Sequence, residues 1–120
     1  MFQYHKAKIE NGECDMDKSK MGNGFKILLS ETGETGKAYM EMVMKGSQAS
    51  ALDRKTQELA YLSVLAALRM TGGIAYHVDS AKELGATKAE VMSAVLVGLP
   101  VVGIQVIDAL SAAAECYGES

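Results

Sequence analysis

Residues 52–85 have the sequence LDRKTQELAYLSVLAALRMTGGIAYHVDSAKELG, and this stretch decides the fold. Asp53 is an N-cap residue type placed directly before a helical first turn. Apolar residues then recur at helical spacing up to about Met70, at Leu59, Leu62, Leu65, Ala66 and Leu68. Thr71-Gly72-Gly73 interrupts this pattern. A second apolar stripe follows and stops at Gly85, with members Ile74, Val78, Ala81 and Leu84. The stretch therefore predicts two helices joined by a glycine turn.

The residues that follow predict a further helix with a strong start signal. Thr87 and Glu90 have the spacing of a capping box, directly before Val91. From Val91 to Ile107 the chain is apolar on nearly all sides, which is typical of a central helix or of one at a subunit contact. Pro100 removes a backbone donor, so we expect it to kink or split this run.

The chain before residue 50 divides into two parts. Residues 1–24 are polar and irregular, and we interpret them as an N-terminal extension. Helical spacing begins at Phe25 and covers residues 25–29 and 34–45, with Gly46 as the following break. Together these patterns predict an all-α fold, formed by a single helical domain over residues 25–120.

Composition and charge exclude several classes of protein. The 120 residues are 48% hydrophobic and 22% charged, which fits one folded domain with a substantial core. With 12 basic and 15 acidic residues, the chain has no cationic field for a phosphate backbone, so we expect no nucleic-acid partner. No apolar run approaches the ~20 residues of a membrane span, and the first residues lack the apolar run of a signal peptide. We therefore expect a cytoplasmic protein without membrane contact.

The two cysteines, Cys14 and Cys116, lie at opposite ends of the chain. They cannot form a CxxC pair or a four-ligand metal cluster. We interpret them as incidental and expect neither a metal nor an organic cofactor.

Three segments, in this order and at this spacing, resemble the carboxymuconolactone decarboxylase family, which includes the alkylhydroperoxidase D-like proteins. They are residues 52–60 (LDRKTQELA), 74–77 (IAYH) and 83–91 (ELGATKAEV). The resemblance covers roughly residues 50–114. It implies the alkylhydroperoxidase D-like fold and a symmetric homo-oligomer, often a trimer or hexamer. The apolar run over residues 91–107 favours an oligomer independently, because so small a domain has little surface of its own to cover it.

The resemblance also assigns positions to the reactive groups of the peroxidase branch. That branch has a Glu on one helix, a CxxC at the start of the next helix, and a His four residues after the second Cys. The matching positions here are Glu58, Met70, Gly73 and His77. A thioether and a hydrogen atom cannot supply the attacking thiolate or the resolving thiol. We therefore expect no thiol peroxidase activity, and in lacking the CxxC this chain is closer to the decarboxylase branch.

Glu58 and His77 each allow a chemical and a structural interpretation. His77 borders the apolar stripe, where it is either a general acid or base, or a core-edge histidine held by neighbouring groups. Glu58 has Leu62 one turn further on. It is either a partly desolvated carboxylate that shares a proton with His77, or a solvated residue near a helix N-terminus. The catalytic hypothesis requires the two side chains to meet in a pocket.

Met70, Gly72 and Gly73 are candidate ligand-binding residues, and each also allows a purely structural interpretation. Met70 belongs to a set of 8 methionines that either packs the core and subunit contacts or lines a pliable apolar pocket. The amides of Gly72 and Gly73 either receive a carboxylate or simply form a turn between helices.

Two functions from different classes follow. The first is a cofactor-free decarboxylase or other lyase acting on a small carboxylated lactone or related acid. In it His77 moves the proton, Glu58 orients the imidazole, and the Gly72 and Gly73 amides receive the carboxylate. The second is a non-catalytic protein that uses the same scaffold to bind a small ligand or to assemble.

Overall fold

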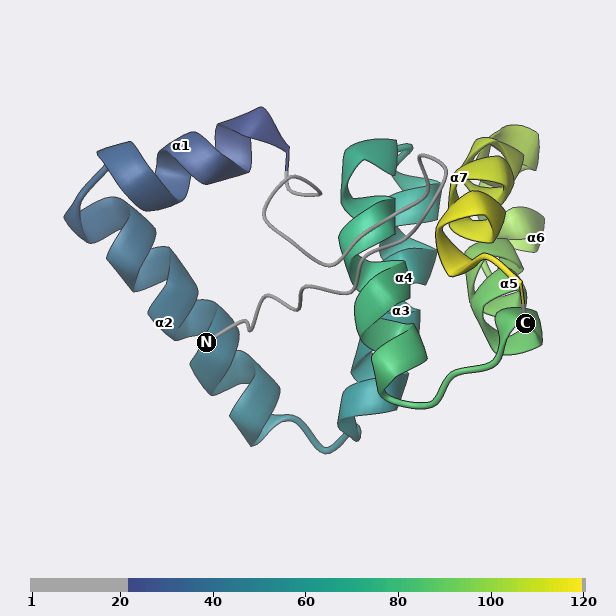
Figure 1. The fold of residues 1–120 in the computed structure, drawn as a ribbon, viewed down its shortest axis with the longest axis horizontal. Helices are drawn as coiled ribbons and strands as arrows, with labels where there is room; N and C mark the ends of the chain where they lie inside the picture. Colours follow the sequence, from purple (N-terminus) through teal and green to yellow (C-terminus); the bar gives the residue numbers. More distant parts are fainter. Residues whose placement is uncertain (1–21, 120) are drawn as a thin grey trace.

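The structure is a computed structural model, and it describes residues 22–119. These residues form helices and short 3-10 turns with no strand among them, which confirms the all-α prediction (Figure 1). In chain order the elements are α1 (Asn23–Glu31), α2 (Glu34–Ala49), α3 (Arg54–Ala67), η2 (Thr71–Gly73), α4 (Ile74–Glu83), α5 (Lys88–Leu96), α6 (Leu99–Val102), η3 (Ile104–Ile107) and α7 (Asp108–Tyr117). Residues 1–21 of the expected N-terminal extension lie outside the described residues.

The core is built by α3, α4, α5 and α7, which pack against one another. Each of these helices contributes fully buried apolar side chains, among them Leu62, Val78, Val91 and Ala113. A fully buried Leu or Val side chain stabilises a fold by about 1.5–3 kcal/mol, so these contacts hold α3 firmly against α4. None of the helices within residues 22–119 is long and apolar enough to span a membrane.

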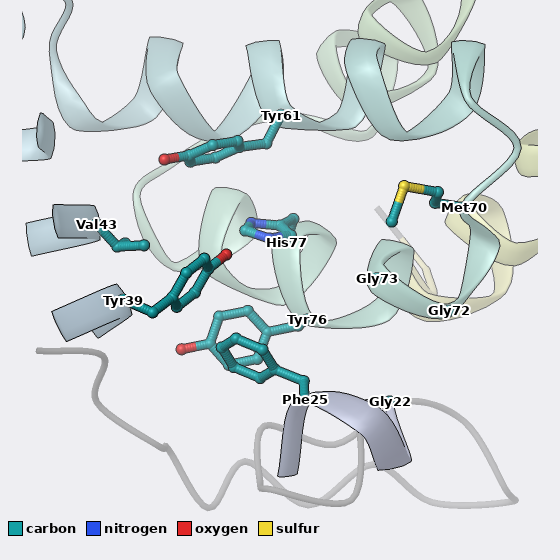
Figure 2. Close-up of a pocket in the computed structure, with 10 residues that line it drawn as sticks. All are labelled: Gly22, Phe25, Tyr39, Val43, Tyr61, Met70, Gly72, Gly73, Tyr76 and His77. Atoms are coloured by element: carbon teal, nitrogen blue, oxygen red, sulfur yellow. The ribbon is translucent and has the colours of Figure 1, made fainter. Parts of the chain in front are cut away.

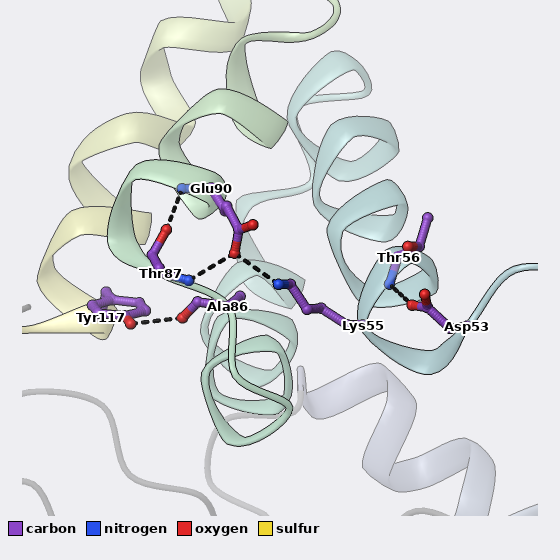
Figure 3. A network of polar contacts seen from close by, with 7 residues as sticks. All are labelled: Asp53, Lys55, Thr56, Ala86, Thr87, Glu90 and Tyr117. Carbon is purple, nitrogen blue, oxygen red and sulfur yellow. Dashed lines mark hydrogen bonds and ion pairs between the residues drawn. The ribbon is translucent and has the colours of Figure 1, made fainter.

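Helix α3 has clear start and stop signals. Its N-cap Asp53 accepts a hydrogen bond from the backbone N–H of Thr56 at 2.7 Å (Figure 3). The helix ends before the expected Met70, because Arg69 adopts a left-handed conformation with φ of 61°. The N–H of Met70 then donates to the Leu65 carbonyl at 2.9 Å, the bond of a Schellman motif. The chain turns back here and enters α4, which runs beside α3 in the opposite direction (Figure 1).

The capping box predicted for α5 is present and also links two helices (Figure 3). Glu90 donates its backbone N–H to the Thr87 hydroxyl at 3.0 Å, and its carboxylate accepts from the Thr87 backbone N–H at 2.9 Å. Lys55, in the first turn of α3, contacts the same carboxylate at 3.0 Å. The starts of α3 and α5 are thereby joined, while Tyr117 of α7 donates to the Ala86 carbonyl just before α5.

The apolar run over residues 91–107 is not one helix. It divides into α5, α6 and η3, with Pro100 in the first turn of α6 and Gly103 at a φ of 93° directly after it. The expected split at Pro100 is confirmed. Val95 of α5 is fully buried, whereas Val101 and Ile104 are 82% and 74% exposed. The expectation of a central position is therefore right for α5 and for Val106 of η3, which is also fully buried. Other apolar side chains of α6 and η3 are at the surface, where a subunit contact stays a prediction.

Helices α1 and α2 form an arm, residues 23–49, that leans away from the rest of the molecule (Figure 1). The two helices touch at Gly36, where an added Cβ would lie only 2.2 Å from the Leu28 carbonyl oxygen. The expected break at Gly46 is wrong, because α2 continues through it to Ala49. The inner side of the arm faces α3 and α4 (Figure 1).

Candidate functional site

Glu58 and His77 meet. His77 Nδ1 lies 2.7 Å from Glu58 Oε1, a hydrogen-bonding and ion-pair distance. Glu58 stands in the second turn of α3 and His77 in the first turn of α4, so the reversal of the chain at Arg69 brings them together. The Glu58 side chain is 5% exposed and that of His77 is 19% exposed. The solvated interpretation of Glu58 is therefore wrong.

This contact sets the chemistry of the imidazole ring. An ionised carboxylate only accepts hydrogen bonds, so with Glu58 ionised the bond at Nδ1 places the ring proton on that nitrogen. Nε2 of the neutral ring is then an acceptor, free to take a proton from a bound molecule. When it does so, the buried carboxylate of Glu58 stabilises the imidazolium that forms. The pair has the parts of a general base and its orienting group.

Two tyrosine rings hold the imidazole in place (Figure 2). The ring of Tyr61 lies 4.8 Å from that of His77, centroid to centroid, at an interplanar angle of 40°. Tyr76 contacts the same ring edge to face, at 5.4 Å and 74°. Because Tyr61 follows Glu58 by three positions on α3, one face of that helix presents both side chains to His77.

The imidazole forms part of the wall of a pocket of about 450 Å³ between the arm and helices α3 and α4. That volume is in the range of small-molecule sites. The wall is mostly aromatic and apolar, and is made by Gly22, Phe25, Tyr39, Val43, Tyr61, Met70, Gly72, Gly73, Tyr76 and His77 (Figure 2). None of the described residues in this wall is a lysine or an arginine. Glu58 lies behind His77 rather than in the wall.

The structure therefore places four of the five expected site residues in the wall of one pocket. The fifth, Glu58, is hydrogen-bonded to His77. Met70 is 54% exposed and lies in the wall, so the interpretation of Met70 as core packing is wrong. The amide of Gly73 donates to the Met70 carbonyl at 3.2 Å, so it is not free to hold a ligand carboxylate, and this part of the expectation is corrected. Among the described residues the Gly72 amide has no hydrogen-bond partner.

Sequence reasoning missed the aromatic part of the wall: Phe25, Tyr39, Tyr61 and Tyr76. A usable signal existed for two of these. Tyr61 follows Glu58 by one helical turn, and Tyr76 directly precedes His77. No local pattern could have found Phe25 or Tyr39, because they reach the pocket from the arm.

Resolved pKa shifts lie at the helix starts that position the site. The backbone N–H of Thr56 lowers the pKa of Asp53 below its ordinary value of 3.8. The backbone N–H of Thr87, followed by the ammonium of Lys55, lowers the pKa of Glu90 below its ordinary 4.5. Both carboxylates are held in the charged form by the caps of α3 and α5.

Cys116 is buried in α7 and is disulfide-bonded, so our interpretation of this cysteine as incidental is wrong. Cys14 lies outside the described residues. Within residues 22–119, no group of three His, Cys, Asp or Glu side chains could hold a metal ion.

The described residues thus form an all-α protein with a buried Glu–His pair beside a small, mostly aromatic pocket. A family model described as the carboxymuconolactone decarboxylase family matches residues 33–115. The chain belongs to this family, as the three sequence segments indicated. Searches of curated proteins and of solved structures found no match.

Proposed function

We propose that this protein is a lyase of the carboxymuconolactone decarboxylase type, in which His77 transfers a proton to or from a small organic acid bound in the pocket. One observation carries the proposal: the 2.7 Å contact between Glu58 and His77 at the wall of a pocket of about 450 Å³. An ion pair with a member this deeply buried contributes little net stability compared with apolar packing, so its presence favours a chemical role.

The proposed step is the decarboxylation of a carboxylated lactone. The carbon–carbon bond to the carboxylate breaks, CO2 leaves, and the electron pair moves into the conjugated lactone carbonyl, which becomes an enolate. The imidazolium of His77 then donates its Nε2 proton to the ring carbon. Glu58 keeps Nδ1 protonated and offsets the positive charge of the imidazolium while it exists. The imidazole ring of His77 then takes up a proton from water before the next cycle.

The pocket wall supports a small, flat substrate. Aromatic rings from α1, α2, α3 and α4 line the pocket and suit the faces of a planar ring. We propose that the substrate carboxylate lies on the Gly72 side, close to Met70 and away from the buried carboxylate of Glu58. On decarboxylation the negative charge moves from the carboxylate to the enolate, and an apolar wall around the carboxylate favours its departure as neutral CO2, which needs no counter-ion.

The test is turnover of a panel of carboxylated γ-lactones, followed as CO2 release, by wild-type protein and the His77→Gln variant. Gln keeps a polar side chain but cannot carry a proton at neutral pH, so we expect the rate to fall about a hundredfold to ten-thousandfold. Thermal shifts with the same panel report binding separately. Binding without turnover in the wild type would instead support the non-catalytic ligand-binding function on this scaffold.

A further inference from the structure

Three tyrosines line the pocket, and their hydroxyls differ in direction (Figure 2). Tyr61 covers His77 with its ring, and its hydroxyl points away from the imidazole. Tyr76 also directs its hydroxyl away from His77. Tyr39, which comes from α2 across the pocket, points its hydroxyl toward the imidazole. A molecule in the pocket thus has the His77 ring on one side and the Tyr39 hydroxyl beside it.

The part of the fold that the structure describes makes no use of the Tyr39 hydroxyl. Among residues 22–119 no hydrogen bond joins it to another group, in contrast to the hydroxyl of Tyr117, which donates to the Ala86 carbonyl at 2.7 Å. The Tyr39 ring is nevertheless held, since Phe25 packs edge to face against it at 5.8 Å and 75°. A positioned donor without a structural bond is available to a ligand.

The pocket also needs such a donor. An enolate oxygen that gains negative charge must be met by hydrogen-bond donors, and the described wall has no lysine or arginine to supply a fixed cation. The imidazolium of His77 gives its Nε2 proton to the ring carbon, so it does not donate a hydrogen bond to the enolate oxygen. The remaining candidates in the wall are tyrosine hydroxyls and the Gly72 amide, and of the hydroxyls only that of Tyr39 points toward the imidazole.

We propose that Tyr39 is a catalytic residue that donates its hydroxyl hydrogen bond to a substrate carbonyl oxygen as this oxygen becomes an enolate. The site accordingly takes a planar substrate with a conjugated carbonyl oxygen. This inference rests on the proposed function for its reaction, but the oxygen-binding role of Tyr39 can be tested by itself. In this proposal the arm supplies a catalytic group, because both Tyr39 and the Phe25 ring that packs against it belong to the arm.

The test uses 4-nitrophenolate as a planar oxyanion and 4-nitrotoluene as the matched ligand in which a methyl group replaces the oxygen. Affinities of both ligands are measured by calorimetry for wild type and Tyr39→Phe, at a pH where the phenol is ionised. A hydrogen bond to a charged oxygen predicts a loss of roughly tenfold to a hundredfold in 4-nitrophenolate affinity for Tyr39→Phe. The affinity for 4-nitrotoluene should stay the same, because that ligand has no oxygen to accept the hydrogen bond.

Three results would overturn the inference: wild-type affinity of Tyr39→Phe for 4-nitrophenolate, an equal loss of affinity for 4-nitrotoluene in Tyr39→Phe, or no binding of 4-nitrophenolate by the wild type. Circular dichroism checks that Tyr39→Phe is folded. Because Tyr39 is 40% exposed, we expect the removal of its single oxygen atom to leave the fold intact. Failure of the proposed function gives a different result. The Tyr39 effect on 4-nitrophenolate would then persist while no lactone in the panel is turned over.

Discussion

Glu58 and His77 are 19 positions apart in the sequence, yet Oε1 of the first and Nδ1 of the second are 2.7 Å apart in the fold. The two side chains are not equally buried, because 5% of the Glu58 side chain is exposed but 19% of the His77 side chain. Removing the Glu58 side chain and removing the His77 side chain should therefore lower the free energy of unfolding by different amounts.

The first prediction follows from this asymmetry. His77→Ala leaves a buried carboxylate without its partner and should lower the free energy of unfolding by about 3 kcal/mol. Glu58→Ala leaves a neutral imidazole nearer to solvent and should cost less. Urea unfolding at neutral pH measures both. The double variant Glu58→Gln, His77→Ala should recover part of the loss, since no buried charge remains; a double variant less stable than His77→Ala would contradict this account.

The same pair can be predicted from sequence only up to a point. Helical spacing, the cap at Asp53 and the stop signal at Gly85 place Glu58 on one helix and His77 on the next. Their contact depends on where the first helix ends, and that is decided by Arg69 in a left-handed conformation. A non-glycine residue with positive φ has a weak sequence signal, so the helix was expected to continue to Met70.

The pocket was less predictable than the pair. Met70, Gly72 and His77 are near one another in sequence, and local reasoning found them. Tyr39 reaches the pocket from α2, which is linked to the core through a short segment and has only Gly36 buried. The direction of such an arm depends on tertiary contacts, which helical periodicity does not encode.

The second prediction concerns acid stability. The pKa of Asp53 and that of Glu90 are lowered in the folded protein, so both groups favour the folded state above their ordinary values of 3.8 and 4.5. This stabilisation is lost as the pH falls through these values toward the lower folded pKa. Thermal unfolding between neutral pH and pH 3 should show the decline.

Asp53→Asn is the matched variant for this effect. Asparagine still caps a helix but does not titrate. Its melting temperature should be close to that of the wild type at low pH and should vary less with pH. An unchanged pH dependence would mean that other carboxyl groups cause the acid destabilisation.

The third prediction concerns assembly through α6 and η3. We propose that the exposed apolar side chains of these elements, Val101, Ile104 and Ile107, lie at a contact between subunits together with Val97 at the end of α5. Ile104→Glu should then give smaller particles by light scattering, because an unpaired charge in an apolar contact costs several kcal/mol. Ser111→Glu, which adds the same charge at another exposed position, should leave the particle size unchanged. Val95 cannot serve for this test, since it is fully buried in the core. A monomeric wild type would contradict the proposal.

The fourth prediction concerns the positions where the peroxidase branch has its thiols. Met70 and Gly73 supply no sulfhydryl group, so the wild type should show no thiol-dependent reduction of peroxide at this site. The fold is nevertheless suited to a thiol pair there. The Gly73 amide donates to the Met70 carbonyl at 3.2 Å, a bond between residues three apart that keeps their Cα atoms within the separation that a disulfide needs.

Introducing Met70→Cys together with Gly73→Cys should therefore create a reversible disulfide. Gly73 has φ of −94°, which any residue adopts, and an added Cβ would meet only the end of the flexible Leu65 side chain at 3.2 Å. A thiol at position 73 would also lie one helical turn before His77, whose imidazole favours the reactive thiolate. Peptide mass mapping after oxidation distinguishes the new disulfide from bonds that involve Cys14 or Cys116. If the double variant remains fully reduced under mild oxidation, residues 70 and 73 do not share the thiol geometry of the peroxidase branch.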